Sequence, residues 1–203
     1  MKKIYKEFFL FPDIAVLLVI LAASICVQVW HGLTLPAIGL FAFGMLVFMF
    51  SEYLSHRFFF HLKAPKNSFF LKLLKRLHYD HHKDPNNLHL LFLPLWYSLP
   101  QILLISLVFY LVSGSFWLTL AFAAGLKTML LLYEWKHYVA HRPIKPKTKF
   151  GKNVKKLHIL HHFKNENYWY GVSTPFVDVL FGTLKDEKDV ETSRTVKDLE
   201  KRL

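Results

Sequence analysis

Histidine is the residue with the clearest chemical meaning in this chain, because ten of its 12 histidines fall into four short clusters. Imidazole nitrogens bind zinc, copper, iron and nickel. Two imidazoles three or four residues apart on a helix share a face, with Cβ atoms about 5–6 Å apart, so they can reach one metal ion. The clusters are His56 with His61, His78 with His81 and His82, His137 with His141, and His158 with His161 and His162.

The number and spacing of these histidines predict two metal ions. Three clusters have helical spacing, so we expect the histidines within each to share a face. His56 and His61 are five residues apart, so we expect the helix to break there or each ligand to serve differently. Zinc-like sites use about four ligands and octahedral sites about six, so ten imidazoles exceed what one ion can take.

The identity of the metal depends on the chemistry, since imidazole does not select one ion. A hydrolytic zinc site needs an open position and about three protein ligands, whereas two iron ions can oxidise an unactivated C–H bond with molecular oxygen. Soluble di-iron carboxylate proteins use two Glu-x-x-His pairs, and here only Glu134 with His137 fits. Cys26 is the single cysteine, which excludes a thiolate cluster and a disulfide framework.

Four apolar stretches without Asp or Glu must position these histidines: residues 14–30, 33–50, 95–112 and 116–132. Each spans about 25–27 Å as a helix, close to the ~30 Å hydrocarbon thickness of a bilayer. Long buried helices of a soluble protein would normally alternate with polar faces, and these do not. We predict an all-α integral membrane protein with four transmembrane helices.

Charge placement predicts the orientation, because Lys and Arg near membrane ends stay on the cytosolic side. Except for Lys127, these residues lie at the N-terminal tip, in 57–83, or from 136 onward. Both termini and the histidine clusters are therefore expected in the cytosol. The net charge of +12 suits anionic lipid headgroups better than nucleic acid. Lys127 lies inside the fourth stretch, where it meets a lipid carboxylate or phosphate or, more simply, snorkels to the cytosolic edge.

The chain is read as one membrane domain, 1–203, in which each pair of spans is followed by a histidine-rich segment, 51–94 and 133–184. The matching order of the clusters predicts two functionally equivalent halves. Five phenylalanines either line an apolar path for a lipid chain or pack at the membrane interface, namely Phe58, Phe59, Phe60, Phe69 and Phe70. The polar tail, 185–203, has apolar residues near helical spacing, so we predict a solvated helix there.

The histidine boxes resemble those of the fatty acid hydroxylase and sterol desaturase superfamily. The His-Arg-Phe box is most similar to that of the fatty acid 2-hydroxylases. The resemblance rests on Glu52-Tyr53, His56-Arg57-Phe58-Phe59-Phe60-His61, His78-Tyr79-Asp80-His81-His82-Lys83, Tyr133-Glu134 with His137-Tyr138 and His141, His158 to His162, Asn165-Glu166-Asn167, Tyr170-Gly171-Val172-Ser173-Thr174-Pro175, Asp178 and Phe181-Gly182-Thr183.

This resemblance implies a cytosolic cap of shorter helices that holds the dimetal site. It also implies oxygen-dependent hydroxylation of a lipid acyl chain, of a fatty acid or sphingolipid and at the 2-position, by two iron ions held by the ten histidines. Zinc can replace iron during preparation. Electrons must come from a separate protein, as no cofactor-binding domain is visible. Asp80 and Glu134 are candidates to accept hydrogen bonds from ligand histidines, although a surface ion pair with a lysine is an equal alternative. The candidate substrate contacts are His89, Tyr138, Asn167 and Tyr170.

Two other functions remain open. A carotenoid or sterol hydroxylase, or a desaturase, uses similar histidine boxes, and composition does not separate these activities. A metal-ion transporter is the rival from another class, but its ionisable ligands should line a path inside the spans. Here the clusters lie just beyond the apolar stretches, which favours the oxygenase.

Overall fold

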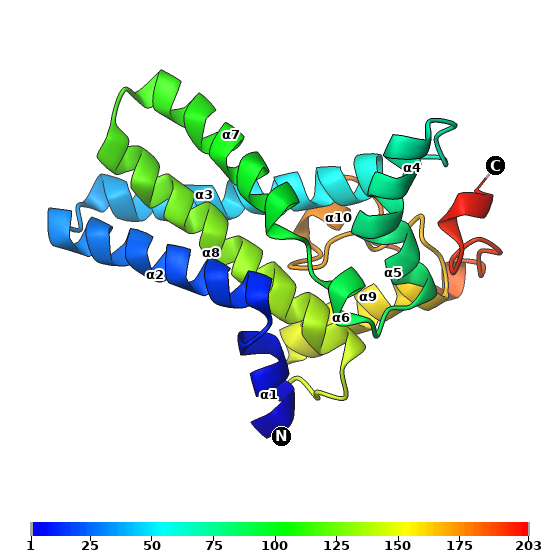
Figure 1. Cartoon of the computed structure of the whole chain (residues 1–203). Coiled ribbons are helices and arrows are strands. Elements are labelled where there is room, and N and C mark those ends of the chain that lie inside the picture. Colours follow the sequence, from blue (N-terminus) through cyan, green and yellow to red (C-terminus); the bar gives the residue numbers. More distant parts are fainter. Residues whose placement is uncertain (1, 203) are drawn as a thin grey trace. The chain divides into compact units, whose positions relative to one another are not determined.

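A computed structural model describes residues 2–202, and every regular element in that range is helical (Figure 1). The all-α class predicted from the sequence is confirmed. The chain forms two compact units. The first comprises Met1–Phe48 and Leu93–Leu132, and the second comprises Met49–Phe92 and Tyr133–Leu203.

The first unit holds the apolar helices. After the short helix α1 (Lys2–Phe9) come α2 (Pro12–His31), α3 (Leu35–Leu54), α7 (Leu95–Ser113) and α8 (Phe116–His141), of which α3 and α8 run on into residues of the second unit. Four segments are long and apolar enough to cross a membrane, with mean hydropathy between 1.5 and 2.3. The predicted number of spans is therefore confirmed.

Short turns join these helices in pairs. Gly32 follows α2 with φ of 121°, and Gly114 follows α7 with φ of 62°, in the region of positive φ that side chains with a Cβ disfavour. Pro12 begins α2, where its missing N–H has no helical partner to lose. These two turns therefore depend on the backbone freedom of glycine.

Helix α8 is the most buried of the four. Half of its apolar window is buried, against 17–28% in the other three. A Cβ on Gly44 would lie 2.2 Å from the carbonyl oxygen of Phe122, and a Cβ on Gly125 would lie 2.0 Å from that of Phe41. Glycines on both helices therefore let the backbones of α3 and α8 touch, a packing that membrane helices favour.

The second unit consists of short helices and loops. Asn67 caps the start of α4 by accepting hydrogen bonds from two backbone amides, and Thr148 caps α9 by accepting one from Gly151, which fixes where each helix begins. The elements are the π-helix η1 (Ser55–Phe60), α4 (Ser68–Leu74), the π-helix η2 (Lys75–Tyr79), α5 (Asp80–Lys83), α6 (Leu88–Leu91), α9 (Lys149–Phe163), α10 (Phe176–Leu180) and the 3-10 turns η3 (Glu187–Asp189) and η4 (Leu199–Lys201).

The tail differs from the prediction. Residues 185–202 contain no α-helix and are not a solvated element, because Val190, Val196 and Leu199 are all buried. Leu199 packs with Leu74 and Tyr79, and Val190 joins another apolar cluster of the second unit. These apolar residues are buried one by one along a segment of turns and 3-10 helix rather than along one helical face.

Candidate metal centre

The two histidines five residues apart are brought together by a π-helix. Helix α3 widens into η1 between Ser55 and Phe60. In a π-helix each N–H bonds to the carbonyl five residues earlier, and such turns are frequent at functional sites. His56 and His61 therefore come round to the same side, with ring centroids 5.0 Å apart. The predicted break is instead a widening of the helix, and both histidines join one group.

All ten clustered histidines gather in the second unit in two groups of five. Within each group the candidate ligand atoms lie within 4.8 Å of one another, and none of these histidines is more than 9% exposed. The first histidine group is His56, His61, His78, His82 and His161, and the second is His81, His137, His141, His158 and His162.

The two groups exchange one histidine between the halves of the chain. The first group takes four ligands from the first half and His161 from the second, and the second group takes His81 in return. In each His-x-x-His-His run the residues four apart stay together, whereas the middle histidine crosses over. The sequence did not assign particular histidines to either ion, so this division comes from the tertiary structure. The His82 and His162 rings stack at 4.1 Å, so the groups are neighbours.

Backbone carbonyl oxygens orient three rings of the first histidine group. The Nδ1 atoms of His56, His82 and His161 lie 2.5, 2.8 and 2.7 Å from the carbonyl oxygens of Tyr170, Val196 and Tyr168. A carbonyl can only accept, so each Nδ1 carries the hydrogen and each Nε2 presents a lone pair. Metal-bound histidines are oriented in this way.

The donor set fits a cation. The Nε2 atoms of His56 and His82 lie 3.2 and 3.0 Å from the Nε2 of His78. The Nε2 of His78 carries at most one hydrogen. At least one of these two close nitrogen pairs therefore has lone pairs facing each other with no hydrogen between them. In the second histidine group, the buried Nε2 of His162 has no hydrogen-bond partner among residues 2–202. A metal ion at the centre of each group would satisfy these atoms.

Burial keeps these rings neutral. Desolvation, followed by repulsion from neighbouring imidazoles, holds the pKa of His78, His81 and His158 well below the usual value. Desolvation lowers the pKa of His82 to about 3. Only neutral imidazole binds a metal, so the low pKa values keep the lone pairs ready at neutral pH.

The comparison with known proteins agrees with this geometry. Residues 41–183, which contain all ten clustered histidines, match the family described as fatty acid hydroxylase. The chain belongs to the fatty acid hydroxylase family.

The chain resembles members of the fatty acid hydroxylase family both in sequence and in structure. It is 38% identical over 156 residues to "Fatty acid 2-hydroxylase" of Mus musculus, covering 74% of this chain and 41% of that protein. It is 35% identical over 155 residues to "Dihydroceramide fatty acyl 2-hydroxylase FAH2" of Arabidopsis thaliana, covering 75% and 64%. The solved structure "Full length scs7p (only hydroxylase domain visible)" matches with a TM-score of 0.79 at 27% identity, over 92% of this chain and 69% of that one. The chain thus spans about two fifths of the length of its mammalian relative.

Residues 168–173 lie in the C-terminal part of the family resemblance and form a loop, here called the carbonyl loop. This loop carries two of the carbonyl oxygens that orient histidine rings. Trp169 lies between Tyr168 and Tyr170, whose carbonyl oxygens accept these hydrogen bonds from the rings, and has φ of 58° although it is not glycine. Such a conformation persists only where the surroundings hold it. Trp169 is fully buried, and its Nε1 donates to the Lys185 carbonyl oxygen at 2.9 Å.

Two buried carboxylates hold the carbonyl loop. Asp178 accepts hydrogen bonds from the amides of Tyr170 and Gly171, each at 2.8 Å. Glu52 accepts from the next two amides, of Val172 and Ser173, at 2.7 and 2.9 Å. The role of these two acids was not assigned from the sequence, which shows their presence but not that they bind backbone amides rather than metal.

The tail also contributes to the first histidine group. Besides the Val196 carbonyl, Arg202 donates to the carbonyl oxygen of His61 at 2.7 Å and to Asn167 Oδ1 at 2.7 Å. Lys83 forms ion pairs with Asp198 and Glu200 at 3.0 and 2.6 Å. Sequence reasoning missed Val196 because a backbone acceptor has no side-chain signature.

Three of the remaining candidates lie near the histidines or within the core, and a fourth, Asn167, lies at the surface. Tyr170 is 4% exposed, and its ring centroid lies 5.3 Å from those of His61 and His161. Burial raises the pKa of the Tyr170 phenol to about 12. Glu134 and Tyr138 are buried, and Asn167 is exposed and bound to the tail.

The structure does not bring two other candidates to the histidine groups. Asp80 lies 4.0 Å from Lys75 Nζ, which is the surface ion pair given as the alternative to a bond with a ligand. His89 is exposed and belongs to neither histidine group.

Proposed function

We propose that this chain hydroxylates the acyl chain of a fatty acid or sphingolipid, at the 2-position, with a di-iron centre held by the two histidine groups. The support is the pair of neighbouring histidine groups, each with five candidate ligand nitrogens. It is joined by the similarity to relatives named fatty acid 2-hydroxylase and dihydroceramide fatty acyl 2-hydroxylase. Two iron ions bound there would supply the oxidation of an unactivated C–H bond by molecular oxygen.

The protein's contribution is to hold the ligands in place and to keep water away. Carbonyl oxygens fix three rings of the first histidine group, so these ligands need no rearrangement when metal binds. Phe60 is 3% exposed and stacks on His78 with a centroid distance of 5.4 Å, and Tyr170 covers the same group. These apolar rings exclude water from the centre, which protects a reactive site from side reactions.

We further propose that the centre faces the cytosol and that a separate protein delivers electrons. The support for orientation is the placement of Lys and Arg, which are missing from the turns at 31–35 and 113–115. Phe58, Phe69 and Phe70 are 51–69% exposed, as expected of aromatic residues that pack at the membrane interface.

Lipid analysis tests the proposed reaction. Total lipids of cells with and without the gene would be hydrolysed, and 2-hydroxy fatty acids would be measured by mass spectrometry after growth under ¹⁸O₂. We expect loss of the gene to remove 2-hydroxy acyl species that otherwise carry one labelled hydroxyl oxygen. Unchanged 2-hydroxy acids with altered sterols or carotenoids would replace this proposal with the second activity of the same superfamily.

Complementation with variants ties the product to the centre. His161→Ala removes one ligand of the first histidine group and should fail to restore 2-hydroxy acids. His31→Ala is the matched control, because His31 stacks on Trp117 with a centroid distance of 3.7 Å and belongs to neither group. Full activity of the His161→Ala protein would contradict the assignment.

A further inference from the structure

An unpaired lysine lies inside the first unit. Lys127 is on α8, in a segment apolar enough to cross a membrane. Its side chain is 7% exposed, and it has no hydrogen-bond or ion-pair partner among residues 2–202. A cationic side chain in the hydrocarbon region is costly, and such residues almost always find a partner or mark a binding site.

The structure argues against the simpler explanation of snorkelling. A snorkelling lysine buries its methylene stem and places its ammonium group in water. Lys127 is only 7% exposed and lines a pocket between α2, α7 and α8 instead. An anion that reaches this pocket would offset the cost of the buried charge.

A cavity adjoins this lysine. It has a volume of about 430 Å³ and is lined by residues of α2, α7 and α8, including Ile20, Leu99, Leu103 and Ala123 beside Lys127. That volume lies in the range of small-molecule sites. The hydroxyl of Ser106, also in the lining, donates to the Ile102 carbonyl oxygen at 2.7 Å, so Lys127 is the one lining group with a charge to offer.

We propose that this cavity binds an acyl chain carrying an anionic group, a carboxylate or a phosphate, and that Lys127 pairs with that anion. The apolar walls match the chain, and the single cation matches the headgroup. The proposal does not depend on the reaction at the histidine groups, because every lining residue belongs to the first unit.

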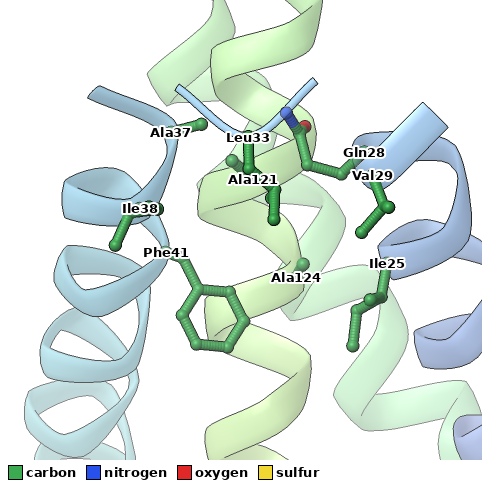
Figure 2. Close-up of a pocket in the computed structure, with 9 residues that line it drawn as sticks. All are labelled: Ile25, Gln28, Val29, Leu33, Ala37, Ile38, Phe41, Ala121 and Ala124. Atoms are coloured by element: carbon green, nitrogen blue, oxygen red, sulfur yellow. The ribbon is translucent and has the colours of Figure 1, made fainter. Parts of the chain in front are cut away.

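Another cavity of this unit gives an internal contrast. It has a volume of about 260 Å³ and is lined by apolar residues such as Ile25, Phe41 and Ala124, with Gln28 as its one polar side chain (Figure 2). It lacks a charged group, so it should not distinguish an anionic amphiphile from a neutral one. Gln28→Leu is therefore a matched control.

Binding can be measured on the purified full chain in nanodiscs of neutral phosphatidylcholine. The probe is a fluorescent fatty acid, displaced by palmitic acid, by hexadecanol or by phosphatidylglycerol. We expect palmitic acid to displace it better than hexadecanol of the same chain length. Lys127→Met should weaken displacement by palmitic acid about tenfold, the size of one charge-assisted hydrogen bond. Lys127→Arg and Gln28→Leu should keep it.

The comparison of palmitic acid with phosphatidylglycerol identifies the source of the anion. Stronger displacement by palmitic acid than by phosphatidylglycerol indicates a free fatty acid, and the reverse order indicates a phospholipid. Equal affinity of wild type for palmitic acid and hexadecanol would overturn the proposal without any variant. Wild-type affinity of the Lys127→Met protein for palmitic acid would do the same. Metal content and circular dichroism of each variant verify that the fold is intact.

Discussion

Replacing Leu199 with alanine should release the tail and loosen a metal ligand. Leu199 is fully buried against Leu74 and Tyr79, and three residues before it the Val196 carbonyl oxygen accepts from His82 Nδ1 at 2.8 Å. Removal of a buried leucine side chain costs about 2–5 kcal/mol. The partly exposed ion pairs of the tail contribute about 0.2–1 kcal/mol each, so they do not compensate for this loss.

The expected effect on metal binding follows from the loss of the carbonyl at His82. Loss of a group that orients a metal-bound histidine typically lowers metal affinity about 10–100-fold. Chelator competition followed by metal analysis would measure the affinity, and hydrogen exchange of residues 185–202 would report whether the tail is docked. Leu199→Met should behave as wild type because it conserves volume. Leu180→Ala is a control for leucine removal at a position that is 57% exposed.

Two results would refute this reasoning. If the tail of the Leu199→Ala protein exchanges rapidly while metal affinity stays at the wild-type value, the Val196 carbonyl does not position His82. If the tail remains protected from exchange, the packing of Leu199 is not what holds it.

Three further perturbations test other parts of the structure. Gly44→Ala should lower the unfolding temperature, because its Cβ would lie 2.2 Å from a backbone oxygen and overpacking costs about 1–3 kcal/mol; Gly39→Ala, with open space around it, should not. Asp178→Asn should speed hydrogen exchange in the carbonyl loop, since a buried amide left without its acceptor costs about 1–3 kcal/mol. Hydrogen bonds from Lys83 and Lys75 hold the pKa of Glu200 below its ordinary 4.5. Because the pKa of Glu200 is lower in the docked tail than in the unfolded chain, its ionised carboxylate stabilises the docked tail above about pH 4.5. This stabilisation is lost as the pH falls through the pKa of the docked state. Tail exchange, corrected for its intrinsic rate, should therefore rise below about pH 4.5 and stay flat between pH 5 and 7, and Glu200→Gln should remove that step.

The spans and the presence of a metal centre were predictable from local sequence. The length of an apolar run alone sets whether a helix can cross a bilayer, so residues 14–30 and 116–132 indicated spans before any tertiary contact was known. Ten clustered histidines indicated two ions because coordination numbers are limited.

The partition of ligands between the ions was not predictable. His81 and His161 each lie in a His-x-x-His-His run whose sequence does not separate its histidines. Only the tertiary structure places His81 in the second histidine group and His161 in the first. The π-helix at His56 also escaped prediction, because the sequence carries no marker for a single widened turn. The prediction of a solvated helix in the tail was wrong because buried residues on a segment of turns and 3-10 helix can imitate helical spacing.

Metal analysis of anaerobically purified protein tests the central claim most directly. With two separate groups of five imidazoles, the wild-type chain should bind two ions at saturation, and His161→Ala and His81→Ala should each weaken one site while His31→Ala weakens neither. A wild-type chain that saturates with a single ion, or a His161→Ala chain that binds two ions as tightly as wild type, would contradict it.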